Sequence, residues 1–424
     1  MLDIRLLREQ TDEVVRRLAT VGCPAEEVRR VLDVDERRRA LIAEAESMRA
    51  ERKQASKRIG AMAPGDEQEA AKAEVRALGE RMAERETERA KLEEEFRRLM
   101  LELPNLPHPD APEGADDSAN VVTRTEAPPR ALACEPKPHW EIGEALGIID
   151  FERGVKISGT RFYVLRGDGA RLQRALIAFM LDLHTTEHGF SEVYPPAMVR
   201  EECLFGTGNL PKFGDNLYRD AEEDFYFVPT AEVPVTNMYR DEVLDADSLP
   251  VLHVAYSPCF RREKMSAGRD VRGIKRGHQF DKVEMVKFVH PDRSDAELES
   301  LVASAEQVAV RLGLQHRIVE MCTGDLSFCA ARKFDIEIWA PGSEEWLEVS
   351  SCSNFADFQA RRANIRFRAG RDKPAFVHTL NGSGLALPRV LIALLESYQR
   401  PDGSVEIPEP LRAYMGGRSE IVPQ

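Results

Sequence analysis

The sequence lacks the cysteine patterns that bind metals or form a disulfide framework. Its seven cysteines include no Cys-x-x-Cys pair and no histidine-rich partner cluster, so we expect no zinc site. An odd number of cysteines is typical of proteins that remain in a reducing compartment.

Long apolar runs are also missing. No stretch of the sequence approaches the ~18 consecutive apolar residues that a membrane span requires. The opening MLDIRLLREQTDEVVRRL is charged throughout and lacks the apolar segment of a signal peptide. We therefore expect a cytoplasmic protein with no membrane partner.

The sequence has no excess of positive charge and no dinucleotide-binding glycine motif. The formal net charge of −14 argues against indiscriminate binding of nucleic acid, DNA included, although it allows a local basic patch. No GxGxxG motif follows a strand-like segment, which disfavours a doubly wound nucleotide-binding fold.

A long helical region opens the chain. At 424 residues the chain is long enough for two or three domains, and residues 1–102 contain almost no proline. Apolar residues recur there with heptad spacing on both sides of the turn signal Pro64-Gly65-Asp66, and Arg85 and Arg89 interrupt the second series. We expect a helical domain over 1–102 with an antiparallel coiled-coil arm over about 30–100, turning near 63–67. Each helix of about 30 residues would be about 45 Å long.

Basic residues gather toward the turn of this arm. Those expected to contact nucleic-acid phosphates are Arg52, Lys53, Lys57, Arg58 and Arg76. Glutamates lie between them, and a mixed charge run is usually a solvated helix face. Dimerisation or simple spacing is the alternative role for the arm.

The composition changes after the arm. Residues 103–120 are rich in proline and acidic residues and predict a linker. Residues 121–424 alternate short β-branched and aromatic runs with helical stretches, which predicts an α+β domain with a mostly antiparallel sheet flanked by helices.

The first candidate for chemistry is residues 260–288. Strand alternation would put Arg261 and Glu263 on one face of the first strand, and Phe280, Lys282 and Glu284 on one face of the second. The loop between the two strands carries Gly268, Arg269, Arg272, Gly273, Lys275, Arg276 and Gly277. An arginine, a basic loop and an aromatic ring suit a nucleotide polyphosphate and its base. A surface hairpin with cross-strand ion pairs is the alternative.

Two further stretches carry the same chemistry. Glu348 lies in the strand-like segment 344–354, where a Mg²⁺ ion held together with substrate phosphates would satisfy its carboxylate. Residues 378–396 run from a strand into a helix through Gly382-Ser383-Gly384, and we interpret these glycines as allowing close approach of a ligand. Arg389 follows Pro388 near the start of that helix, where anions collect.

In this order, the three stretches resemble the three signature motifs of class II aminoacyl-tRNA synthetases. The chain is similar over essentially its whole length to bacterial-type seryl-tRNA synthetases. The matching segments are MLDIRLLRE, GFSEVYPPAMV at 189–199, GTGNLPKF, PTAEVPVTN, FRRE with RGIKRGHQFDKVEMV, LEVSSCSNFADFQARR and TLNGSGLALPR. These matches are long and specific, and 189–199 resembles the motif 1 segment of the dimer interface.

The resemblance implies roles for individual residues in an ATP site. Arg261 would bind the α-phosphate, Glu263 the adenine amino group, and Phe280 would stack on adenine. Arg389 would hold the γ-phosphate, and Arg261, Arg389 and Glu348 would be the catalytic residues.

The same resemblance places Glu348 and Ser351 on Mg²⁺, with Ser350 in the ATP site as well. Strict alternation puts Ser350, rather than Ser351, on the face of Glu348. A β-bulge between them would reconcile the two.

The resemblance also implies a serine pocket and an activity. The pocket would consist of Thr230, Glu232, Arg261, Glu284, Asn381 and Ser383. The implied reaction is serine–tRNA ligation: L-serine and ATP give seryl-adenylate and pyrophosphate, and serine is then transferred to tRNA(Ser) and tRNA(Sec). The implied enzyme is a homodimer.

Three alternatives stay open. An amino acid:carrier-protein ligase should lack the long arm, and a non-catalytic paralogue should have lost signature residues. An inhibitor-resistant duplicate would still charge serine, and nothing in the sequence separates it from a housekeeping enzyme.

Overall fold

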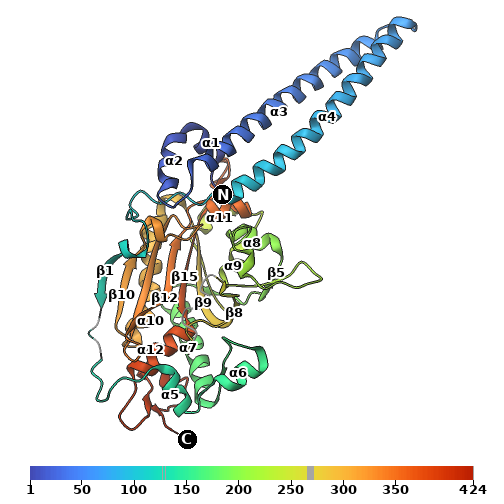
Figure 1. Ribbon diagram of the computed structural model, residues 1–424. Helices are drawn as coiled ribbons and strands as arrows, with labels where there is room; N and C mark the ends of the chain where they lie inside the picture. Colours follow the sequence, from blue (N-terminus) through green and yellow to red (C-terminus); the bar gives the residue numbers. More distant parts are fainter. Residues whose placement is uncertain (127, 129, 265–271, 424) are drawn as a thin grey trace. The chain divides into compact units, whose positions relative to one another are not determined.

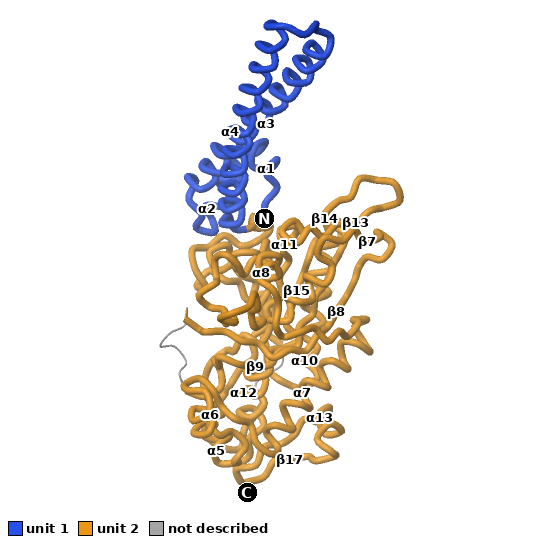
Figure 2. Tube along the Cα trace, turned by 90° about the vertical axis from the view of Figure 1, so that its right-hand side faces the viewer, with its two compact units in different colours: residues 1–104 blue, residues 105–424 orange. Residues whose placement is uncertain are grey.

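The computed structural model describes residues 1–126, 128, 130–264 and 272–423. The chain forms two compact units, residues 1–104 and residues 105–424 (Figure 2).

Unit 1 is helical (Figure 1). Its elements are α1 (Ile4–Glu9), α2 (Thr11–Ala19), α3 (Ala25–Gly60) and α4 (Asp66–Glu102). The turn at 61–65 separates the two long helices, which pack antiparallel along an apolar seam. The buried side chains of this seam are Val34, Leu41, Met48, Ala71, Leu78, Leu92 and Leu99. The heptad spacing therefore corresponds to a real interhelical contact.

Ion pairs connect α3 and α4 beside the seam. Arg85, which interrupts the apolar series, lies with its Nε 3.2 Å from Oε1 of Glu44 on the other helix. Closer to the base of the arm, Arg38 lies 3.0 Å from Glu93. Because at least one partner of each pair is exposed to solvent, pairs of this kind contribute little stability.

One carboxylate in unit 1 is buried among arginines. Asp35 on α3 is 0% exposed. Its two oxygens accept hydrogen bonds from Arg8 on α1, at 2.7 Å each, and from Arg38 and Arg39 on its own helix. Burial alone would raise the pKa of Asp35, but the guanidinium groups of Arg8 and Arg38 hold it below its ordinary value. Asp35 therefore ties α1 to the base of the arm.

Replacing Asp35 with alanine should destabilise unit 1 by about 3 kcal/mol, because it leaves arginine charges without their buried partner. Hydrogen–deuterium exchange over residues 1–60 of the full chain would measure this as faster exchange. The difference from the unchanged chain should shrink in acid, since the depressed pKa makes the stabilisation present at neutral pH and lost as Asp35 is protonated. Asp33→Ala is the matched control, because Asp33 forms an exposed pair with Arg37; an equal effect of both changes would contradict the prediction.

Unit 2 is built on an eight-stranded sheet with the order β1-β10-β11-β12-β15-β9-β8-β4. The strands are β1 (Val121–Glu126), β4 (Ser191–Glu192), β8 (Val251–Phe260), β9 (Gln279–Val289), β10 (His316–Glu320), β11 (Arg332–Ala340), β12 (Glu345–Asn354) and β15 (His378–Ala386). The pairings are antiparallel from β1 through to β8, and β4 runs parallel to β8. The predicted α+β fold with a mostly antiparallel sheet is confirmed.

Three helices cover one face of this sheet (Figure 1). They are α7 (Gly167–Thr186), α10 (Ser294–Arg311) and α12 (Leu387–Ser397). Their buried residues pack with side chains such as Val283 and Met285 of β9 and Ile336 of β11 in one hydrophobic core. Because side chains alternate along a strand, the intervening residues of β9 face the opposite side of the sheet. That opposite side carries the candidate site.

Shorter elements surround the sheet. The helices are α5 (His139–Ala145), α6 (Phe151–Ser158), α8 (Glu201–Thr207), α9 (Glu232–Asn237), α11 (Phe358–Ala363) and α13 (Glu409–Arg412). The short strands are β2 (Ile149–Asp150), β3 (Val164–Leu165), β5 (Met198–Val199), β6 (Tyr226–Phe227), β7 (Val243–Asp245), β13 (Arg366–Arg368), β14 (Ala375–Phe376), β16 (Val405–Glu406) and β17 (Glu420–Ile421). In the described parts of the chain, none of the helices is long and apolar enough to cross a membrane.

The predicted linker differs from the structure. Residues 105–120 belong to unit 2, and the Asn105 side chain is 5% exposed. Its Nδ2 donates to the carbonyl oxygens of Cys329 and Phe355, at 2.8 Å each. A proline-rich composition predicts extended backbone but does not reveal whether that backbone packs against a domain.

Candidate active site

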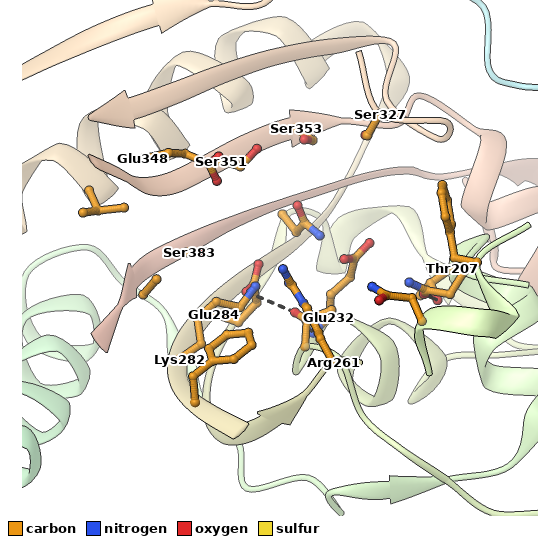
Figure 3. A pocket seen from close by; sticks show the side chains of 18 of the residues that line it. Thr207, Glu232, Arg261, Lys282, Glu284, Ser327, Glu348, Ser351, Ser353 and Ser383 are labelled. Carbon is orange, nitrogen blue, oxygen red and sulfur yellow. Dashed lines mark hydrogen bonds and ion pairs between the residues drawn. The ribbon is translucent and has the colours of Figure 1, made fainter. Parts of the chain in front are cut away.

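A cavity of about 570 Å³ is lined by side chains of β9, β12 and β15 and of the segments around them (Figure 3). It collects side chains from segments that are far apart in the sequence. The predicted site residues that line it are Thr230, Glu232, Arg261, Glu263, Phe280, Glu284, Glu348, Ser351, Asn381, Ser383 and Arg389. The fold thus brings the three candidate stretches together around one space.

Arg261 and Glu263 do not lie on a strand as predicted, although both side chains line the cavity. β8 ends at Phe260, and Glu263 has a φ of 49°, in the left-handed region that few non-glycine residues adopt. Arg261 is held instead by its backbone N–H, 2.9 Å from the carbonyl oxygen of His278, and by its Nε, 3.3 Å from that of Pro229. Side-chain alternation applies only within a strand, so it could not predict where the backbone leaves the sheet between β8 and β9.

The guanidinium of Arg261 lies 5.1 Å from the centroid of the Phe280 ring. Arg276, from the basic loop, lies 3.8 Å from a carboxylate oxygen of Glu263. Gly268 and Arg269 of the predicted loop lie outside the described residues. The cavity wall here combines positive charge with an aromatic face, as a nucleotide would require.

The alternation predicted for β9 is found. Phe280, Lys282 and Glu284 all line the cavity, and Lys282 pairs with Glu284. The hydroxyl of Thr230 donates to Oε2 of Glu284 at 3.2 Å. Glu284 is 1% exposed, so this carboxylate is sequestered at the cavity floor beside its two partners.

Glu232 lies close to Glu284 in the same part of the cavity (Figure 3). Burial, together with the negative charge of Glu284, raises the pKa of Glu232 to about 7. Hydrogen bonds from Gln359 and Asn381 and the charge of Lys282 act in the opposite direction. Glu232 can therefore be either ionised or protonated near neutral pH, and such a carboxyl group suits the recognition of a small polar substrate.

The bulge that would place Glu348 and Ser351 on one face is present. Ser350 pairs with Ile336 and Glu348 pairs with Glu337, so Val349 is the extra residue. Glu348 and Ser351 consequently both line the cavity (Figure 3). Ser350 is 1% exposed, and its hydroxyl donates to the carbonyl oxygen of Ser383 at 2.6 Å. Its predicted place in the nucleotide site is therefore corrected: Ser350 connects two strands beneath the cavity.

Charges around Glu348 favour its ionised form. Burial alone would raise its pKa, but Arg389, Lys333 and Arg261 together hold the pKa of Glu348 below its ordinary value. Nη1 of Arg389 donates to the carbonyl oxygen of Glu348 and lies 3.4 Å from its Oε1. An ionised carboxylate next to a phosphate-binding arginine is an arrangement that also suits a divalent cation.

The residues present fit Mg²⁺. The Glu348 carboxylate and the Ser351 hydroxyl are hard oxygen ligands on one face of β12, as such a cation prefers. Behind them on β11, Oδ1 of Asp335 is buried without a hydrogen-bond partner among the described residues. Burial and the charge of Glu348 raise the pKa of Asp335 to about 7. Nζ of Lys333 lies 3.5 Å from Oδ2 of Asp335 and offsets part of this effect. A cation would add to that positive charge beside the two carboxylates.

Arg389 lies in the first turn of α12, with Pro388 before it, as predicted. The interpretation of the glycines is wrong. A Cβ at Gly382 would meet Sγ of Cys352 at 2.7 Å, and one at Gly384 would meet Nε2 of His184 at 2.5 Å. These glycines let β15 pack closely against the protein core, and they do not admit a ligand.

Several cavity residues were missed. Lys275, Arg276 and Lys282 were recognised only as loop charge or as part of a strand face, although all three line the cavity. The other missed residues are Thr207, Gly208, Asn209, Phe213, Asn216, Gly277, Ser327, Phe328, Cys329, Val349, Ser353, Phe355, Ala386 and Pro388. Most of these residues lie in segments that carry the family resemblance, but their spacing gave them no role in the site, because they reach the cavity through tertiary packing.

A buried histidine is hydrogen-bonded to the backbone of the basic loop. Nε2 of His139 accepts a hydrogen bond from the backbone N–H of Ile274 at 3.2 Å. Its Nδ1 lies 2.9 Å from Oε1 of Glu396, which is fully buried on α12. The histidine therefore connects the helix of Arg389 to the segment that carries Lys275 and Arg276.

Comparison with known proteins identifies the family of the chain. Residues 1–107 match the Seryl-tRNA synthetase N-terminal domain, and residues 215–398 match the tRNA synthetase class II core domain (G, H, P, S and T). The chain is 63% identical to the serine–tRNA ligase of Thermomicrobium roseum over 99% of this chain and 95% of that protein. The chain belongs to the seryl-tRNA synthetase family. As a member of it, the chain is an ATP-dependent ligase with a class II core.

Solved structures of seryl-tRNA synthetases share the whole fold. The enzyme from Pyrococcus horikoshii complexed with ATP has a TM-score of 0.94 and 39% identity, covering 100% of both chains. The cytoplasmic enzyme from Naegleria fowleri in complex with AMP has a TM-score of 0.88 and 30% identity, covering 100% of this chain and 99% of that one. The family resemblance of the sequence is thus confirmed at the level of the fold.

Proposed function

We propose that the chain activates L-serine with ATP, giving seryl-adenylate and pyrophosphate, and then transfers the seryl group to a ribose hydroxyl at the 3′ end of tRNA(Ser) with release of AMP. The observation that carries this proposal is the shared cavity. Arg261, Glu348 and Arg389, which would bind ATP, line the same cavity as Glu232 and Glu284. A polyphosphate and a small amino acid can therefore meet in the same space.

The first step requires alignment and charge stabilisation more than proton transfer. The carboxylate of free serine is already ionised at neutral pH, so its attack on the α-phosphorus needs no general base. Arg261 would neutralise the α-phosphate in the transition state, and Arg389 would orient the departing pyrophosphate. When bound, Mg²⁺ supplies further positive charge to the phosphates, and Glu348 and Ser351 would hold it.

Serine would be selected by the acidic part of the cavity. Thr230, Glu232 and Glu284, with Asn381 and Ser383, offer oxygen acceptors for the ammonium and hydroxyl groups of serine. A site built to hydrogen-bond a hydroxyl can reject an analogue that lacks it by about 10⁴-fold, because its buried acceptors then stay unpaired. Alanine should therefore be a poor substrate.

The transfer step requires tRNA, and we propose that the arm of unit 1 binds it. Arg52, Lys53 and Lys57 lie together on α3 with exposed side chains, and Arg58 on α3 and Arg76 on α4 are exposed as well. Such a surface suits phosphate contacts that follow the shape of an RNA rather than its bases. We propose tRNA(Sec) as a second acceptor on the same ground, since shape recognition tolerates more than one sequence.

We also propose a cytoplasmic homodimer. Tyr194, in the segment that resembles motif 1, is 89% exposed, and a large exposed aromatic side chain suits an interface. Neither a membrane nor DNA is required for the reaction.

Serine-dependent exchange of labelled pyrophosphate into ATP tests the first step. We expect exchange with L-serine in the presence of Mg²⁺, and a kcat/KM about 10⁴-fold lower with alanine. Absence of exchange with serine, or equal exchange with alanine, would contradict the assigned pocket.

A further inference from the structure

A fully buried glutamine lies directly behind Glu232. Gln359, on α11, is 1% exposed. Its Nε2 donates to Oε1 of Glu232 at 2.7 Å and to the carbonyl oxygen of Thr207 at 3.2 Å. Its own Oε1 accepts from the hydroxyl of Thr379 at 2.8 Å. Both ends of the amide are therefore occupied.

The neighbours of this amide determine which way it points. The Thr207 carbonyl can only accept a hydrogen bond, so the NH₂ end must face it and Glu232 together. The Thr379 hydroxyl then meets the amide oxygen and donates to it. Thr379 is itself 1% exposed, on β15, so neither side chain can exchange its partner for water. A donor fixed in this way can hold a carboxylate in one orientation.

We propose that Gln359 is a positioning residue for recognition of the amino acid. Thr379 donates a hydrogen bond to Gln359, and Gln359 donates one to Glu232, so that the Glu232 carboxylate is held in place. This inference rests on the proposed function, since it takes Glu232 as part of the serine pocket. Gln359 does not line the cavity described above, and it would touch neither serine nor ATP. Replacing Gln359 should therefore weaken the binding of serine and leave the binding of ATP unchanged.

The positioning role of Gln359 can also be tested through the pH dependence of the reaction, because neighbouring groups change the pKa of Glu232. Glu284 raises the pKa of Glu232, whereas Lys282 and the hydrogen bonds from Gln359 and Asn381 lower it. Loss of the Gln359 donor should therefore raise that pKa further. If ionised Glu232 binds the serine ammonium, kcat/KM for serine falls as the pH drops through about 7, and this fall should move to higher pH without Gln359.

Gln359→Met keeps the length of the side chain and removes the donor. We expect the KM for serine in pyrophosphate exchange to rise roughly 10- to 100-fold, since a hydrogen bond to a charged group is lost. The KM for ATP should stay near its unchanged value, and the pH profile of kcat/KM for serine should shift upward. A KM for serine that does not change, or KM values for both substrates that rise together, would overturn the inference.

If Gln359→Met fails to fold, two substitutions of Thr379 provide a matched pair of variants for the same test. Thr379→Ser keeps the hydroxyl and should behave like the unchanged chain, whereas Thr379→Val removes it at nearly equal volume and should raise the KM for serine selectively. Equal behaviour of the two would overturn the inference. If the unchanged chain shows no serine-dependent exchange, the proposed function fails; if it shows exchange while Gln359→Met and Thr379→Val leave the KM for serine unchanged, only the positioning role fails.

Discussion

Replacing Arg261 with alanine should lower the rate of serine-dependent pyrophosphate exchange by about 10³-fold or more. Arg261 is the cavity arginine that the family resemblance assigns to the α-phosphorus, where charge develops during attack. Its Nε contact with the Pro229 carbonyl fixes the guanidinium before substrate arrives, so little reorganisation is needed in the transition state. Exchange kinetics with purified protein measure the effect directly.

Arg262→Ala is the matched control for this prediction. Arg262 follows Arg261 directly, yet its guanidinium lies toward the Tyr218 ring, 5.9 Å from the ring centroid. Its loss should leave exchange nearly unchanged. Arg261→Lys should restore only part of the rate, because an ammonium keeps the charge but not the planar pair of donors. Equal loss from Arg261→Ala and Arg262→Ala would show that general charge, and not the position of Arg261, controls the reaction.

Shortening the arm should separate the two half-reactions. Replacing residues 46–83 by a short Gly/Ser turn keeps the Glu44–Arg85 contact, the Arg38–Glu93 contact and the buried Asp35 cluster, so the base of unit 1 should still fold. The cavity lies wholly in unit 2 and should keep its exchange activity. Charging of tRNA should fall by roughly 100-fold or more, because the phosphate contacts of the arm are lost.

Parallel assays of exchange and of tRNA charging on this shortened chain measure the separation. A milder change, Arg52, Lys53 and Lys57 each to glutamine, should weaken charging in the same direction and reduce its dependence on salt. Charging that survives the shortened arm would contradict the tRNA-binding role, and loss of exchange would show that the arm supports the catalytic unit in some other way.

Periodicity predicted the regular parts of this molecule well. The heptad spacing and Pro64-Gly65-Asp66 indicate two long helices, and α3 and α4 lie on either side of that turn. Alternation on β9 correctly groups Phe280, Lys282 and Glu284. Both patterns are local, because each follows from the backbone geometry of a single element.

Two of the errors occurred where the chain departs from a regular element. β8 ends before Arg261, and a bulge at Val349 changes which serine accompanies Glu348. Spacing alone could not locate either irregularity; the bulge was expected only because a resemblance required Ser351. The roles of Gln359 and His139 were missed for a related reason, since the hydrogen bonds from Gln359 to Glu232 and from Ile274 to His139 join residues more than a hundred positions apart.

The most direct test of serine–tRNA ligation is the transfer of labelled L-serine to a total tRNA pool in the presence of ATP and Mg²⁺. We predict that the purified full-length chain charges serine-accepting tRNA, and that Arg261→Ala does not. Serine-dependent exchange without any charging of tRNA would contradict the account and indicate another acceptor, such as a carrier-protein thiol.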